Sequence, residues 1–490
     1  MAVRANPNAP GAAAVGELRS QLRGALIQPT DAAYGTARLV ANAAYDRRPE
    51  LIVRAANSDD VIRAIEFASR WDLPLAVRSG GHSVPGHSTG DGALVIDLSR
   101  MRRLEIDPTA SIARVQPGLT AGEYVEQADA FGLGTTFGDN GAVGIGGLTL
   151  GGGIGFLARR DGLTVDQLLA AEMITVDGRR VTASAEEHPD LFWALRGGGG
   201  NFGVVTDLRF RMRPAGTIYG GWLILPATGE VIRGAVAASI SAPDALTTII
   251  NVMRLPALPG VPAERVGELA VVITAAHSGG PKRTGPAAGG LSATDLHAAE
   301  SAFRPLRALD RPILDRVGVR PYRELFGFFN EVPVPARRAS VRRNTFLDRL
   351  DDALIDTILD FTSRAPSLAG TAQLRVLGGA VSRVPADATA YAHRDRPILL
   401  MLYTDWEAGS DPAPNHDWIE RFWAMAGPHG SGAYVGFLSG DEPSDVHAAY
   451  PDPTYARLAA VKRSWDPTNR LRLNHNIQPG PEPSPGRSSV

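Results

Sequence analysis

The sequence predicts a large protein that mixes helices and strands, and two observations support that prediction, one on the order of the elements and one on the length of the chain. Strand-like and helix-like segments alternate over residues 51–211, which is typical of an α+β or α/β protein. At 490 residues the chain is also too long for one ordinary core. We therefore expect two domains or one large intertwined body.

The first expected elements lie within residues 51–98. Residues 51–54, 74–78 and 93–98 are short apolar runs that predict strands. Between the first two, Ser58 is predicted to cap a helix. The two acidic residues after it favour the positive first turn, and the apolar residues beyond them recur on one face.

The remaining elements of the first half follow in order up to Pro214, which we expect to end the first domain. They are an amphipathic helix at 120–131, a glycine-dense segment at 138–155, a helix running into a strand at 166–176, a helix at 190–195 and an alternating strand at 204–211. Residues 278–294 and the tail from Pro479 are rich in Gly, Pro or Ser. They predict a mobile loop and a disordered end.

Composition excludes several classes of function. Hydrophobic residues make up 44% and charged residues 21%, and the net charge of -2 predicts neither a nucleic-acid nor a membrane partner. Cysteine is absent, which excludes disulfides, thiolate catalysis and cysteine-bound metal, and we expect no metal. No apolar run resembles a signal peptide or a membrane span, so the predicted compartment is the cytoplasm.

Close glycine spacings point to a phosphate-bearing cofactor. Residues 198–203 satisfy G-x-G-x-x-G, but a strand rather than a helix follows, so a Rossmann site is excluded. Three glycine loops, at 78–83, 144–155 and 197–203, offer backbone N–H groups that can surround a diphosphate. For a single loop, the alternative is that its glycines only make tight turns and close packing.

The same loops carry a resemblance to a known family. The chain resembles the berberine-bridge-enzyme-like oxidases of the vanillyl-alcohol-oxidase flavoprotein superfamily, and in particular bacterial members such as oxidases of antibiotic pathways. The resemblance runs from about residue 45 to residue 479. Its motifs are Arg78-Ser79-Gly80-Gly81-His82-Ser83, the glycine-rich runs 148–155 and 196–203, and Asp466-Pro467-Thr468-Asn469.

The resemblance implies an α+β fold in five parts. Residues 1–44 are a lead-in, and residues 45–214 are a PCMH-type FAD-binding module of two α+β subdomains. Residues 215–435 form a substrate domain whose antiparallel sheet, covered by helices, lies over the flavin. Residues 436–479 return to the FAD module, and residues 480–490 are a disordered tail.

His82 is the main cofactor residue that the resemblance implies. In this family the equivalent histidine bonds covalently to the 8α carbon of FAD, which requires a neutral imidazole nitrogen. Many relatives add a bond from a cysteine, but Asn140 stands at that place, so only one bond is possible. Val143 matches a position where a small residue is associated with the access of oxygen to the flavin, and ordinary packing is an equally open role for it. The other implied FAD contacts are Arg78, Ser79, Gly80, Gly81, Ser83, His87, Gly144, Gly147, Gly151, Gly152, Gly155, Gly203, Val205, Asn474 and Asn476.

Catalytic and substrate residues are expected in the second half. Tyr403 and Asp405 share one face of a predicted strand at 400–406, and Tyr434 lies in a second candidate strand at 433–437. Each could take a substrate proton, although a packing role is equally open for the tyrosines. Phe437 stands where many relatives carry the base. Gln373 and Arg375, on an adjoining strand, are candidate substrate contacts.

The resulting function is an FAD-dependent oxidase of a small alcohol or amine, in secondary metabolism or catabolism, acting as a monomer or homodimer. Substrate hydride would pass to FAD and then to O₂, giving hydrogen peroxide. The alternatives are a dehydrogenase with another acceptor, an oxygenase of a polyketide-like substrate that uses a flavin–oxygen adduct, and a flavin-binding protein without turnover.

Overall fold

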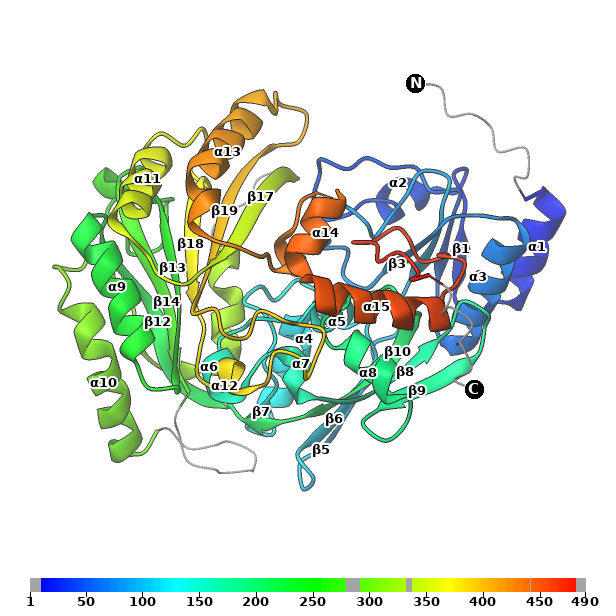
Figure 1. The fold of residues 1–490 in the computed structure, drawn as a ribbon, viewed down its shortest axis with the longest axis horizontal. Coiled ribbons are helices and arrows are strands. Elements are labelled where there is room, and N and C mark those ends of the chain that lie inside the picture. Colours follow the sequence, from blue (N-terminus) through cyan, green and yellow to red (C-terminus); the bar gives the residue numbers. More distant parts are fainter. Residues whose placement is uncertain (1–9, 279–290, 332–336, 441, 482–490) are drawn as a thin grey trace, which may run out of the picture.

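The computed structural model describes residues 10–278, 291–331, 337–440 and 442–481. A four-stranded and a five-stranded sheet lie in one half of the molecule and an eight-stranded sheet in the other (Figure 1). Most of the predicted mobile loop and nearly all of the predicted tail, residues 279–290 and 482–490, lie outside the described residues. No helix in the described part of the chain combines the length and apolarity that crossing a membrane requires.

The first sheet has four strands and holds the predicted strands of residues 51–98. β2, β4 and β3 are parallel, and β1 joins β2 antiparallel. Its strands, in spatial order, are β1 (Ala25–Ile27), β2 (Leu51–Arg54), β4 (Leu94–Asp97) and β3 (Leu75–Arg78). The helices of this region are α1 (Ala12–Gln21), α2 (Tyr34–Ala37) and α3 (Ser58–Arg70).

The cap of α3 corrects one prediction. The helix is capped by Asn57, whose side chain accepts a hydrogen bond from the Asp60 amide at 3.0 Å, and Ser58 is already its first residue. Asn and Ser are nearly equal as N-caps, so neighbouring candidates cannot be separated by residue type. The extended backbone of Asn57, with φ −156°, decides between them.

The second sheet has five antiparallel strands. Its central strand is the predicted alternating strand 204–211. In spatial order the strands are β5 (Leu104–Asp107), β6 (Ile112–Val115), β10 (Val204–Arg211), β8 (Leu168–Ile174) and β9 (Arg180–Ser184). The helices of this region are α4 (Ala121–Asp129), α5 (Ile145–Leu150), α6 (Ala158–Asp161), α7 (Thr164–Gln167) and α8 (Pro189–Leu195), and β7 (Leu133–Gly134) pairs with β11 (Arg213–Pro214).

The third sheet has eight antiparallel strands, and helices cover one of its faces (Figure 1). Its path is β15 (Leu314–Asp315), β12 (Thr217–Pro226), β14 (Leu269–His277), β13 (Leu246–Arg254), β18 (Thr371–Val376), β19 (Ile398–Glu407) and β17 (Arg338–Leu347), and β16 (Gly318–Pro321) also pairs with β12. The covering helices are α9 (Gly229–Ser241), α10 (Ala293–Arg307), α11 (Asp352–Ser363) and α13 (Ala413–Ala426). Alternate strand residues such as Leu223, Ile250 and Leu402 pack under these helices, which leaves the other face for the site.

After the large sheet the chain returns to the first half. α14 (Pro443–Ala449) and α15 (Asp452–Trp465) lie against that half (Figure 1). Tyr450, between the two helices, and Leu458 of α15 are buried in the core that contains the five-stranded sheet. The remaining elements are α12 (Ala380–Arg383) and the 3₁₀ helices η1 (Ala263–Arg265), η2 (Tyr322–Glu331), η3 (Gly427–His429) and η4 (Val435–Phe437). The sheets divide near Pro214, but the predicted boundaries at 44, 214, 435 and 479 stay predictions.

The predicted strand at residues 433–437 is wrong. Tyr434 has extended backbone, but Val435–Phe437 form η4. The Tyr434 amide donates to Asn344 Oδ1 at 2.7 Å instead of to a neighbouring strand. A short apolar run is compatible with any buried segment, because burial and not strand pairing selects its composition.

Candidate active site

A cavity of about 900 Å³ is lined by residues from both halves of the fold. The structure brings together most of the predicted site residues around it. Those on its wall are Ser79, Gly80, Gly81, His82, Ser83, His87, Asn140, Val143, Gly144, Gly147, Gly151, Gly203, Val205, Gln373, Arg375, Tyr403, Asp405, Tyr434 and Asn474.

Four predicted cofactor contacts do not lie on this wall. Arg78 is buried behind it and binds Asp97 at 3.0 Å between two strands of the first sheet. Gly152 and Gly155 pack against protein, since a Cβ on them would lie 2.9 Å from the Tyr391 ring and 1.5 Å from the Phe137 carbonyl oxygen, respectively. Asn476 lines a second cavity of about 420 Å³, which His87 and Asn474 also border. Apart from Asn476, these residues shape the wall from behind.

Glycines play two different parts in the wall. A Cβ on Gly80 would lie 2.3 Å from the Gly144 nitrogen, so two of the predicted loops meet backbone against backbone. Gly147 and Gly200 also line the cavity, but a Cβ on either would meet nothing within 4 Å. Their backbone is open to a bound group, which suits the close approach of a diphosphate. The wall therefore fits FAD.

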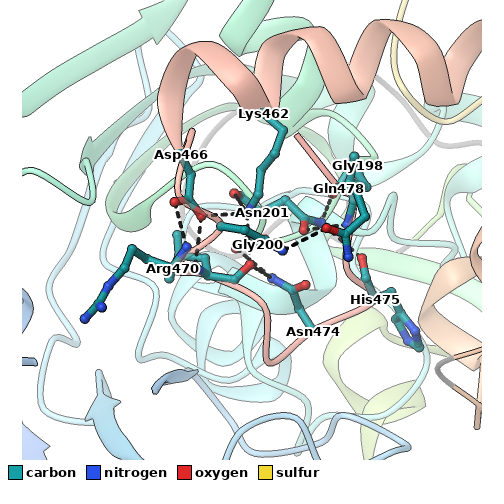
Figure 2. Close-up of polar contacts among 12 residues, drawn as sticks. Gly198, Gly200, Asn201, Lys462, Asp466, Arg470, Asn474, His475 and Gln478 are labelled. Carbon is teal, nitrogen blue, oxygen red and sulfur yellow. Dashed lines mark hydrogen bonds and ion pairs between the residues drawn. The ribbon is translucent and has the colours of Figure 1, made fainter. Parts of the chain in front are cut away.

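The third glycine loop is held by the returning C-terminal segment (Figure 2). The Lys462 ammonium is fully buried and donates to the carbonyl oxygens of Asn201 and Leu471, at 2.8 and 3.0 Å, and to Asp466 Oδ2 at 2.6 Å. Burial lowers the pKa of Lys462, and Asp466 opposes that shift. The Asn201 side chain donates to the His475 carbonyl oxygen at 3.2 Å (Figure 2). The Asp466 motif thus positions the loop indirectly.

His82 has the protonation state that covalent attachment requires. Its side chain is half-buried on the cavity wall. Burial lowers the pKa of His82 from its usual value, and the positive charge of Arg342 lowers it further. The imidazole is therefore neutral at pH 7 and keeps a nitrogen lone pair available.

Tyr403 and Asp405 form a hydrogen-bonded pair on the open face of the large sheet. The Tyr403 hydroxyl donates to Asp405 Oδ2 at 3.0 Å, and Arg338 binds Asp405 Oδ1 at 2.5 Å. Burial raises the pKa of Tyr403, and the charge of Asp405 raises it further. Tyr403 is therefore a neutral phenol whose proton is directed at a carboxylate.

Gln373 and Arg375 belong to a longer polar chain that joins the two halves. Arg375 donates to Gln373 Oε1 at 2.7 Å and pairs with Asp139 Oδ2 at 2.7 Å. Gln373 in turn donates to Asn251 Oδ1 at 2.8 Å.

Tyr434 is not part of this polar chain. Its hydroxyl accepts a hydrogen bond from the Gly153 amide at 3.1 Å. Burial raises the pKa of Tyr434. Tyr434 on the wall is thus tied to a glycine turn.

Several residues of the site were not found from the sequence. Asp139, Asn251, Arg338 and Arg342 all line the cavity and are polar. Arg338 and Arg342 lie four residues apart on β17, so a period of two puts both on one face. That spacing in a strand-like run was a usable signal. The role of Asp139 had no such signal, because its partner Arg375 is 236 positions away.

Comparisons with known proteins agree with this geometry. Residues 49–184 match the family "FAD binding domain", and residues 433–478 match "Berberine and berberine like". The chain is 31% identical to (R)-6-hydroxynicotine oxidase of Paenarthrobacter nicotinovorans, over 94% of this chain and 97% of the relative.

Solved structures show the same fold. The crystal structure of 6-hydroxy-D-nicotine oxidase from Arthrobacter nicotinovorans superposes with a TM-score of 0.82 at 28% identity, covering 94% of this chain and 98% of the other. Berberine bridge enzyme from Eschscholzia californica superposes with a TM-score of 0.81 at 19% identity, covering 96% and 99%. These matches confirm the predicted α+β fold class and define an FAD-linked oxidoreductase. Within that class of enzyme, the chain belongs to the berberine-bridge-enzyme-like family.

Proposed function

We propose that this enzyme is an oxidase that carries FAD through one covalent bond to His82 and passes substrate electrons to O₂, forming hydrogen peroxide. One observation carries the proposal: a neutral histidine from the FAD-binding half and a tyrosine–carboxylate pair from the large sheet line the same cavity. The substrate is a small alcohol or amine, and the proposed compartment is the cytoplasm. A relative named for 6-hydroxynicotine oxidation supports a small-molecule substrate.

The cofactor would be held mainly by backbone. Gly147 and Gly200 leave room for phosphate oxygens beside their N–H groups, and the tight Gly80–Gly144 contact fixes the two loops relative to one another. Bound FAD supplies the two-electron acceptor that amino-acid side chains lack. Because the chain has no cysteine, His82 would make the single covalent bond.

Tyr403 would move the substrate proton. When the carbon that bears a hydroxyl or amino group is oxidised, that group loses a proton. A neutral phenol can accept this proton only if it releases its own. The Tyr403 proton already points at Asp405 Oδ2, so the two transfers can occur together. Arg338 binds the other Asp405 oxygen, which holds the carboxylate in position before the transfer.

The test uses the purified protein and a screen of small alcohols and amines. After acid precipitation the flavin should stay with the chain, and mass spectrometry should find one FAD on the peptide that contains His82. A substrate that bleaches the flavin without air should generate peroxide in air. Flavin released wholly into the supernatant would refute the covalent bond. Flavin reduction without peroxide would favour a dehydrogenase, and labelled oxygen in the product would favour an oxygenase.

A further inference from the structure

The described wall of the cavity carries more arginine side chains than carboxylates. Among the described residues on its wall, three carry guanidinium groups and two carry carboxylates. Two pairs form: Arg338 binds Asp405 at 2.5 Å, and Arg375 binds Asp139 at 2.7 Å. The third cation, Arg342, therefore has no carboxylate of its own in the described part of the cavity.

Among the residues that the structure describes, the Arg342 side chain has no polar partner. Its guanidinium makes no hydrogen bond or ion pair with any described residue, and its Nε is buried and unpaired. It lies instead 5.1 Å from the centre of the Tyr403 ring and 5.8 Å from that of Phe437. Burial lowers the pKa of Arg342, which is the electrostatic cost of holding this charge away from water. Arginine nevertheless stays protonated near pH 7.

The position of Arg342 relates this charge to the proposed chemistry. Arg342 and Tyr403 are register partners on the adjacent strands β17 and β19. A group bound by the Arg342 guanidinium would therefore lie beside the Tyr403 side chain. The Arg342 main chain is fixed as well, since its amide donates to Ser439 Oγ at 2.9 Å.

The rest of the wall fits an apolar body. The same cavity is lined by Trp222 of β12, Met253 of β13, Leu258 of the loop after β13, and Val272 of β14. An apolar wall with a few placed polar groups is the usual form of a small-molecule site, in which the polar groups set orientation. Guanidinium matches carboxylate through paired N–H donors.

We infer that Arg342 binds a carboxylate of the substrate, so that the substrate class is a small apolar acid that also carries the alcohol or amine to be oxidised. This inference rests on the proposed oxidase function. The phosphates of FAD do not remove the need for such a partner, because the proposed phosphate contacts are glycines of the FAD-binding half, whereas Arg342 belongs to the large sheet.

The probes are benzoate and benzamide, which share a ring and differ in charge. Binding to the holoenzyme is followed by calorimetry and by the visible absorption of the flavin. The wild type should bind benzoate at least about tenfold more tightly than benzamide, and Arg342→Gln should abolish that preference. Arg342→Lys should keep part of it, because the charge remains but the paired donors are lost.

Arg343→Gln is the matched control. It removes the same side chain one position along β17, where the guanidinium is paired with Glu420 of α13. The control should leave both affinities unchanged. Equal binding of benzoate and benzamide by the wild type, an unchanged preference in Arg342→Gln, or an equal loss in Arg343→Gln would each overturn the inference.

The outcome separates this inference from the oxidase function. If neutral alcohols or amines produce peroxide equally well with wild type and Arg342→Gln while benzoate shows no advantage, the oxidase stands and the acidic substrate class is wrong. If the protein carries no flavin, the proposed function fails, and calorimetry still decides whether Arg342 binds carboxylate.

Discussion

The Tyr403 hydroxyl donates a 3.0 Å hydrogen bond to Asp405, two residues further along the same strand. If this pair removes the substrate proton, Tyr403→Phe should slow anaerobic flavin reduction by about 10²–10⁴-fold, the usual contribution of a positioned acid or base. Flavin content and substrate affinity should change little. The measurement is stopped-flow absorbance with a substrate from the screen. A rate within a factor of about two of wild type would assign Tyr403 to packing.

His82→Ala should leave FAD dissociable, because His82 is the one described residue on the wall that is proposed to bond covalently to FAD.

The pKa of His82 also predicts how covalent attachment depends on pH. Folding lowers the pKa of His82 below its usual value of 6.5. As the pH falls, the unfolded imidazole is therefore protonated before the folded one is. The folded histidine thus stays neutral as pH falls through 6.5, and attachment slows only under more acidic conditions.

Reconstitution of the apoprotein with FAD checks this behaviour. Covalent flavin is read as fluorescence of the denatured chain on a gel after fixed times between about pH 5 and pH 8. A rate that already falls by half at pH 6.5 would show an unshifted histidine. Flavin that remains bound to denatured His82→Ala would show attachment at another residue.

Gly147→Val should reduce FAD incorporation without unfolding the chain. A Cβ at Gly147 meets no protein atom within 4 Å, so the added methyl groups would extend into the cavity. Gly318→Val is the control, because a Cβ there also meets nothing and the residue lies in β16, outside the cavity wall. The flavin-to-protein absorbance ratio measures loading. Equal loading of both variants would mean that Gly147 does not approach the cofactor.

Val143→Leu should separate the two halves of turnover. Val143 is half-buried on the cavity wall, and the substitution adds one methylene without a change in charge. Flavin reduction by substrate should keep its rate, while reoxidation by O₂ should slow markedly. Stopped-flow measurement of each half-reaction tests this. A bulky artificial acceptor should still support turnover, and equal slowing of both steps would indicate general disturbance of the site.

Lys462→Met should lower the free energy of unfolding by about 3–5 kcal/mol, since it leaves the buried Asp466 carboxylate without its counter-charge. Denaturant titration of the holoenzyme measures the loss. Adding Asp466→Asn should recover part of it, because the uncompensated charge is then removed. A Lys462→Met variant as stable as the wild type would show that the two backbone donors to Asp466, Arg470 and Leu471, suffice.

The contrast between found and missed residues has a physical explanation. Periodicity determines which residues share a face, so β10 and the Tyr403–Asp405 pair could be predicted from local sequence. It does not determine which charges meet. Arg338, Arg342 and Arg375 are alike in sequence, and only the fold pairs the outer two with Asp405 and Asp139. The cap at Asn57 and the turn at Tyr434 were missed because local composition permits more than one backbone geometry.

The network around Lys462 also has a consequence for biosynthesis. The ammonium that holds the Asn201 carbonyl oxygen is encoded 261 positions after it, beyond every strand of the large sheet. A ribosome at about 5–20 residues per second therefore needs on the order of 13–50 seconds to produce the residue that secures the loop. During that interval the loop would emerge without its support. We expect cofactor loading to be post-translational, and a nascent chain stalled before residue 462 to retain little flavin.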